Sequence, residues 1–132
     1  MQKGDHDIII EGFQRGGGIY QTATYSGPDT GGSRLLIRSV GDGSGELPPL
    51  PPPSAWRPRM YKSNRNLHHV PNVRFMDYVG GATVPFIDFH SLTDFRRYIG
   101  KTPHRNYAWV FHGSLNVKRA GTYTFCTQSD DG

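Results

Sequence analysis

Apolar and polar side chains alternate most clearly in the last quarter of the chain. Tyr107, Trp109 and Phe111 occupy every second position, which places three aromatic rings on one face of an extended strand. Ala108 and Val110 lie between them, so we expect this strand to be buried on both sides. The alternation resumes over residues 114–128 around Gly121, and this pattern predicts a β-hairpin.

Earlier segments show shorter versions of the same pattern. Residues 19–25 are rich in β-forming side chains and predict a first strand, and residues 34–40 predict a second, shorter one. Residues 70–89 contain small apolar groups separated by glycine and proline, which indicates short strands and bends. The one helical signal covers residues 91–100, where Ser91 can cap the first turn and Gly100 can end the last.

Composition supports this fold class. The chain has 17 glycines and 10 prolines among 132 residues, so turns are frequent and long helices are disfavoured. We therefore predict an all-β fold, an antiparallel β-sandwich or barrel-like domain with at most one short helix. Residues 18–132 would form this domain, with a Pro/Gly-rich surface loop over residues 41–58. Residues 1–17 show no sustained pattern and are expected to be a leader or linker.

Charge and cysteine content exclude several classes of protein. The net charge is +4, and residues 33–74 carry seven of the 15 basic side chains but only two acidic ones. We expect this to be a solvated basic face and no nucleic-acid surface, because no aromatic side chains are placed to stack bases.

No apolar run approaches the roughly 20 residues of a membrane-spanning helix, and no secretion signal follows Met1. A single cysteine, Cys126, excludes an intrachain disulfide and is expected to be buried and inert.

The final residues, Ser129-Asp130-Asp131-Gly132, are the strongest candidate for chemistry. Adjacent side chains of an ordinary strand point to opposite faces, so Asp130 and Asp131 would not coordinate the same ion. A cis peptide bond would bring both carboxylates to one side, and Ca²⁺ is the cation that suits such oxygen ligands. The alternative is an exposed turn that binds nothing.

Three segments together resemble the anthrax protective-antigen domain family, often called PA-fourteen. They are the Tyr107-x-Trp-x-Phe-x-Gly-x-Leu-x-Val strand, the Ala120-Gly121-x-Tyr123-x-Phe125 strand, and the Ser-Asp-Asp-Gly ending. Members of this family are β-sandwich domains of toxins, adhesins and glycosidases, and several bind carbohydrate through calcium held by two adjacent aspartates. The resemblance implies that Asp130 and Asp131 are calcium ligands and that the family's later strands and second calcium-binding loop are missing. The domain would therefore be incomplete at its C-terminus.

The resemblance further implies a non-catalytic, lectin-like module of a secreted or cell-surface protein, with a glycan or glycoprotein as partner and no membrane insertion. Two alternatives stay open. One is a structural or protein-interaction domain without sugar binding, and the other is an accessory domain of a larger glycoside hydrolase. If the sandwich lacks strands, we expect the aromatic strand at Tyr107, Trp109 and Phe111 to lose its cover and the isolated chain to be poorly soluble.

Overall fold

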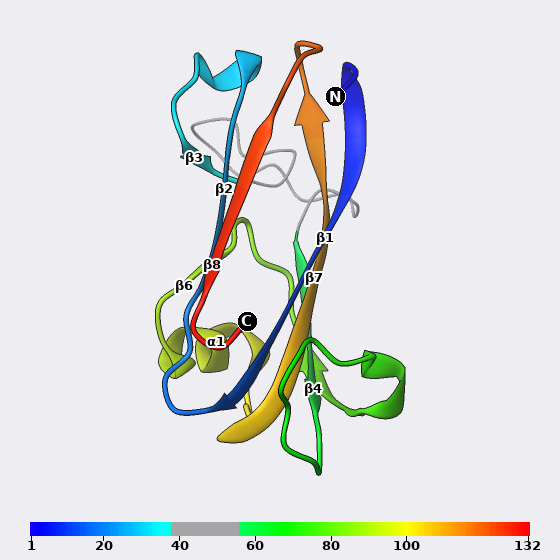
Figure 1. Cartoon of the computed structure of the whole chain (residues 1–132), viewed down its shortest axis with the longest axis vertical. Coiled ribbons are helices and arrows are strands. Elements are labelled where there is room, and N and C mark those ends of the chain that lie inside the picture. The colour runs from blue at the N-terminus through cyan, green and yellow to red at the C-terminus, as the bar shows by residue number, and fades with distance from the viewer. Residues whose placement is uncertain (38–55) are drawn as a thin grey trace.

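The computed structural model describes residues 1–37 and 56–132, and it is predominantly β-structure. It has two antiparallel sheets and one α-helix, as the sequence predicted (Figure 1). The strands are β1 (Gly4–Gly16), β2 (Gln21–Ser26), β3 (Leu35–Leu36), β4 (Arg57–Lys62), β5 (Asp77–Gly81), β6 (Asp88–Phe89), β7 (Arg105–Val117) and β8 (Thr124–Ser129). The helix α1 spans Leu92–Ile99, and 3-10 turns lie at Pro28–Thr30 and Val73–Phe75.

The first sheet has the strand order β1-β7-β4-β5. Strand β1 pairs with β7 along its whole length, from Gly4 opposite Val117 to Gly16 opposite Arg105. Residues 4–16, which we expected to form a leader or linker, are therefore an integral strand of the sheet. The expectation was wrong because glycines at positions 4, 12 and 16 and several charged residues interrupt the apolar pattern. The strand tolerates the charged residues because one of its faces is exposed to solvent.

The second sheet is built around β2. Strand β8 pairs with all of β2, from Gln21 opposite Ser129 to Ser26 opposite Thr124. Strands β3 and β6 pair with opposite ends of its other edge. The predicted hairpin over residues 114–128 is wrong, because residues 114–117 belong to β7 and residues 124–129 to β8, in different sheets. The ladder with β4 ends at His112 of β7, so residues 113–117 pair with β1 alone among the described strands. Strand β8 pairs with β2 in the other sheet instead.

The aromatic face of β7 fills the space between the sheets. Tyr107, Trp109 and Phe111 have relative exposures of 1%, 0% and 0%. The ring of Phe95 lies 5.5 Å from that of Trp109, and the ring of Phe89 lies 5.5 Å from that of Phe111. The expectation that these side chains lose their cover is wrong, because β6 and α1 supply aromatic rings that close the core.

One buried hydrogen bond links the two sheets inside this core. The indole nitrogen Nε1 of Trp109 donates to Oε1 of Gln21 at 3.1 Å. Gln21 is 1% exposed, so this bond satisfies a donor and an acceptor that would otherwise be buried alone. It also fixes the position of β2 against β7.

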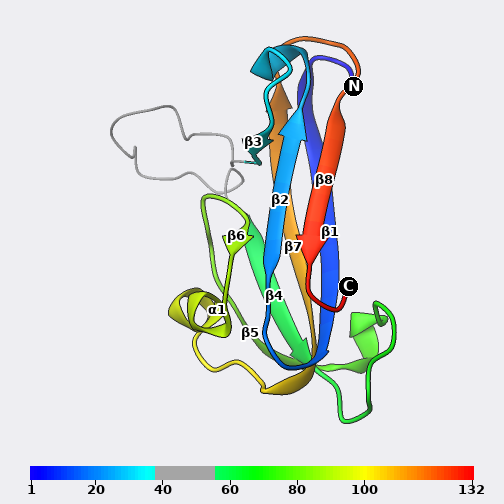
Figure 2. The same cartoon turned by 60° about the vertical axis from the view of Figure 1, so that its left-hand side comes forward.

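Helix α1 confirms the helical prediction. The Ser91 hydroxyl accepts a hydrogen bond from the backbone N–H of Asp94 at 3.2 Å, and Gly100 adopts φ 85° at the C-terminal end. Phe95 and Ile99 are buried, and the helix lies beside β4, β5 and β6 at one side of the sandwich (Figure 2). No helix in residues 1–37 and 56–132 is long and apolar enough to cross a membrane.

The remaining predictions concern short elements and loops. Residues 70–89 form short strands and bends, as expected. The strand predicted over residues 34–40 is reduced to Leu35–Leu36 in its described part, and its last three residues lie outside the described residues. Most of the predicted Pro/Gly-rich loop also lies outside them, but its end was misplaced: Trp56 bridges to Val84, and β4 begins at Arg57.

Candidate functional site

The candidate residues Asp130 and Asp131 lie at the end of β1. After β8 ends at Ser129, residues 130–132, here called the terminal segment, leave β2 and reach the first sheet (Figure 1). The backbone N–H of Phe13 donates to the carbonyl oxygen of Gly132 at 2.7 Å. The backbone N–H of Arg15 donates to Oδ2 of Asp131 at 2.8 Å. The terminal segment is thus attached to the edge of β1 that does not face β7.

Asp130 is held by a buried glutamine. Nε2 of Gln14 donates to Oδ2 of Asp130 at 3.1 Å and to the carbonyl oxygen of Gly16 at 2.8 Å. Gln14 is fully buried, and within the described residues its Oε1 has no hydrogen-bond partner. An unpartnered buried acceptor costs free energy. Oε1 is closed to solvent, and the NH₂ group is the part of the Gln14 amide that faces Asp130.

The structure brings the two aspartates to one place without the expected cis bond. The peptide bond between Asp130 and Asp131 is trans. Their carboxylates nevertheless contact neighbouring residues of β1, Gln14 and Arg15. The expected separation to opposite faces applies to a continuing strand, whereas β8 ends at Ser129 and the terminal segment turns across to β1.

The pKa of Tyr107 is affected by burial and by the charges of the two aspartates. It lies opposite Gln14 in the β1–β7 ladder. Burial raises the pKa of its phenol far above the usual value, and the negative charges of Asp130 and Asp131 raise it further. The Tyr107 hydroxyl therefore stays protonated at physiological pH. It can act only as an uncharged hydrogen-bond donor or acceptor.

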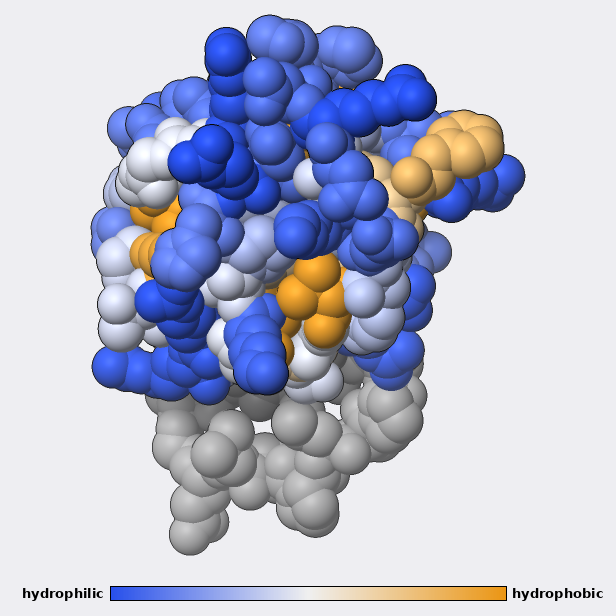
Figure 3. Space-filling view, turned by 90° about the horizontal axis from the view of Figure 1, so that it is seen from below, coloured by the Kyte–Doolittle hydropathy of each residue, from blue (hydrophilic) through white to orange (hydrophobic). Residues whose placement is uncertain are grey.

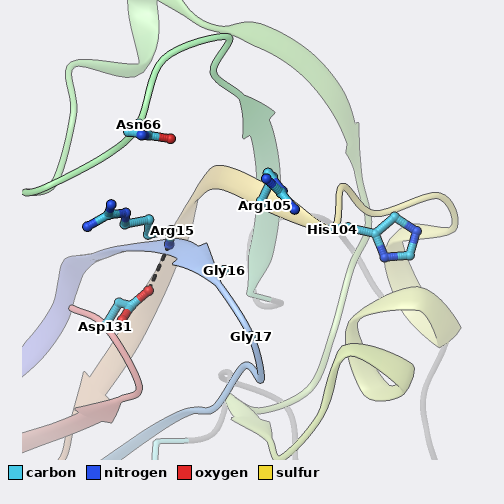
Figure 4. A pocket seen from close by; sticks show the side chains of 7 residues that line it. All are labelled: Arg15, Gly16, Gly17, Asn66, His104, Arg105 and Asp131. Atoms are coloured by element: carbon cyan, nitrogen blue, oxygen red, sulfur yellow. Dashed lines mark hydrogen bonds between the residues drawn. The ribbon is translucent and has the colours of Figure 1, made fainter.

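A polar hollow, here called the end pocket, opens beside Asp131. Its volume is about 540 Å³, and it is lined by Arg15, Gly16, Gly17, Asn66, His104, Arg105 and Asp131. Figure 4 shows that these residues come from the end of β1, the loop after β4, the start of β7 and the terminal segment, and that the His104 ring points away from the others. Viewed from this end, the surface is largely hydrophilic (Figure 3).

The residues at this site are compatible with Ca²⁺. Asp130 and Asp131 are both exposed, and the other oxygen of each carboxylate, Oδ1, accepts no hydrogen bond from the described residues. Oε1 of Gln14 is buried and is not open to an ion that arrives from solvent, so the two carboxylates are the oxygen groups that the site offers. Ca²⁺ takes six to eight oxygen ligands, so the remaining ones would have to come from a ligand's hydroxyl groups. The described residues contain no cluster of three or more His, Cys, Asp or Glu side chains suited to a metal.

A second hollow lies on the outer face of the β2 sheet. It has a volume of about 430 Å³ and includes Thr22, Thr24 and Gln128 among its lining residues. Nε2 of His90 lies 2.9 Å from Oδ1 of Asp88 at its margin. Cys126 also lines it and is only half-buried, so the expectation of a buried thiol is wrong.

Sequence reasoning singled out the two aspartates, whose role stays a prediction, and missed the residues that surround them. Gln14 and Arg15 lie in the segment that we expected to be a leader, and Asn66 and Arg105 carry no motif. An available signal was the run Gly16-Gly17-Gly18 directly after them, which is typical of a tight connection between strands. The pairing of β1 with β7, however, cannot be derived from local pattern.

The comparisons with known proteins add no relative: no protein-family model, no curated protein and no solved structure matches this chain.

Proposed function

We propose that this protein is a non-catalytic carbohydrate-binding module, with the glycan bound in the end pocket. The observation that carries the proposal is the attachment of Asp130 and Asp131 to Gln14 and Arg15 at the margin of a polar hollow. Sugars are recognised by convergent hydrogen-bonding groups in a shaped hollow. Carboxylate, amide and guanidinium side chains from four parts of the chain supply such groups here.

In this proposal Asp130 and Asp131 also hold Ca²⁺, and the NH₂ group of Gln14 positions Asp130. When bound, the ion would supply a positive centre that coordinates sugar hydroxyls. The chain's own residues orient the site: the N–H of Arg15 fixes one oxygen of Asp131, and the amide of Gln14 fixes one oxygen of Asp130. Oδ1 of each carboxylate would then be left for the ion. The PA-fourteen resemblance supports this assignment and a secreted or cell-surface location.

The test is retention of the full chain on an array of immobilised glycans in the presence of calcium. Asp131→Asn keeps an oxygen acceptor for the N–H of Arg15 but removes the charge that a cation requires. We expect the variant to lose at least about tenfold in retention, because calcium affinity depends on the number of charged ligands. Asp7→Asn, on the exposed face of β1, is the matched control. Equal retention of Asp131→Asn and the unaltered protein would contradict the proposal.

A second candidate function is a protein-interaction domain that does not need calcium. Phe75 is 88% exposed and Tyr78 is 62% exposed. The ring of Tyr78 packs edge-on against that of Tyr61 at 5.6 Å. Exposed aromatic side chains are typical anchors of protein interfaces. Phe75→Ser would abolish binding of a protein partner and leave glycan retention unchanged, which separates the two functions.

A further inference from the structure

The end pocket carries more positive than negative side-chain charge. Arg15 and Arg105 are both exposed and line it, and Asp131 is its one acidic lining residue among those described. Neither arginine side chain forms a salt bridge or hydrogen bond with another described residue. Surface arginines commonly pair with carboxylates of their own protein. Two guanidinium groups around one hollow are therefore available to a ligand.

Asp131 does not neutralise these arginines. Its Oδ2 is occupied by the backbone N–H of Arg15, and its carboxylate lies farther from the Arg15 guanidinium than a salt bridge allows. Figure 4 shows the Arg15 side chain extending away from Asp131 on the side of the pocket where Asn66 lies. The aspartate and the two guanidinium groups thus form separate parts of the pocket wall.

Asn66 adds a neutral donor on the same wall. Its Oδ1 accepts a hydrogen bond from Nδ2 of Asn106 at 3.2 Å, which fixes the side-chain amide and directs its oxygen toward the protein. The NH₂ group of Asn66 then remains for a ligand. Guanidinium and amide donors together are suited to carboxylate and sulfate oxygens.

We propose that the glycan is acidic, and that Arg15 and Arg105 hold its carboxylate or sulfate group. This inference rests on the proposed carbohydrate-binding function and specifies the class of sugar. A neutral sugar would leave both guanidinium groups without an anionic partner, whereas an anionic group can accept bidentate hydrogen bonds from them. Because the pocket is open to solvent, dissolved salt will screen the attraction.

The test compares neutral, uronate-containing and sulfated oligosaccharides on one glycan array with calcium present. We expect the protein to be retained on the acidic oligosaccharides. Comparing retention on uronate-containing and on sulfated oligosaccharides then shows whether a carboxylate or a sulfate group binds better. The double variant Arg15→Met/Arg105→Met should lose about tenfold or more on acidic glycans, because charge-assisted hydrogen bonds are lost. Arg119→Met is the control, since Arg119 lies in the β7–β8 connection, at the other end of β7 from Arg105.

The outcomes separate this inference from the function on which it rests. Retention of acidic glycans that falls with added NaCl and in the double variant supports it. Retention of neutral glycans with equal or greater strength, unchanged in the double variant, overturns the inference and leaves carbohydrate binding intact. If no glycan of any class is retained by protein that melts cooperatively, both proposals are contradicted.

Discussion

Trp109 restricts which residue can occupy position 12 of the neighbouring strand β1. Its indole lies against Gly12, where an added Cβ would be 2.6 Å from three of the ring atoms. Trp109 is fully buried and its Nε1 is tied to Gln21, so the ring cannot move without breaking that bond. The requirement at position 12 is therefore for space, and only glycine provides it.

We expect Gly12→Ala to lower the free energy of unfolding by about 1–3 kcal/mol, the range for overpacking of a core. Chemical denaturation monitored by tryptophan fluorescence measures it. Gly16→Ala is the control, because its Cβ would meet nothing closer than 3.9 Å, and we expect a change below about 1 kcal/mol. Equal effects of the two substitutions would show that Trp109 does not pack as described.

At the same scale, the burial of some side chains can be predicted from the sequence and the burial of others cannot. The spacing of Tyr107, Trp109 and Phe111 predicts their burial directly, because a period of two has one structural reading. Gln14 and Gln21 are equally buried, yet a glutamine in a sequence is normally assigned to the surface. Their burial depends on partners far along the chain, Asp130 and Trp109, which no local pattern identifies.

At the scale of elements, α1 shows a charged N-terminal cap. Oδ2 of Asp94 accepts hydrogen bonds from the backbone N–H of His90 at 2.9 Å and from the Ser91 hydroxyl at 3.1 Å. The His90 hydrogen bond lowers the pKa of Asp94 more than burial raises it, with smaller contributions from Ser91 and Arg97. Because the folded-state pKa lies below the unfolded value, the charge stabilises the fold above that unfolded value, about 4.

This stabilisation should disappear as the pH falls through the folded-state pKa of Asp94. We expect Asp94→Asn to be less stable than the unaltered protein at pH 6 and the difference to shrink steadily toward pH 2.5. Urea denaturation at a series of pH values measures it. A difference in unfolding free energy that stays constant over this range would mean that the Asp94 charge makes no contribution.

Strand pairing marks the limit of prediction at this scale. Alternation correctly indicated strands near residues 107–117 and 123–128, but it assigned them to each other as a hairpin. Pairing depends on contacts between segments far apart in the chain: β7 pairs with β1 and β4, and β8 pairs with β2. The capping residues of α1 were predictable because Ser91, Asp94 and Gly100 act within one helix and need no distant partner.

At the scale of the whole molecule, the site depends on the meeting of the terminal segment with the last residues of β1. The terminal segment reaches β1 from the opposite sheet and hydrogen-bonds to Phe13, Gln14 and Arg15. The all-β fold was predictable from composition and alternation, whereas the role of Asp130 and Asp131 stays a prediction. The end pocket was not, because its lining residues come from segments separated by up to 116 positions.

The most direct test of the central claim is retention of the unaltered chain on the glycan array with calcium and then with excess chelator. We predict strong retention in calcium and at least about a tenfold loss in chelator, with circular dichroism showing the same β-structure in both. Retention that is equal in the two conditions would contradict the claim that Asp130 and Asp131 hold a cation that binds the sugar.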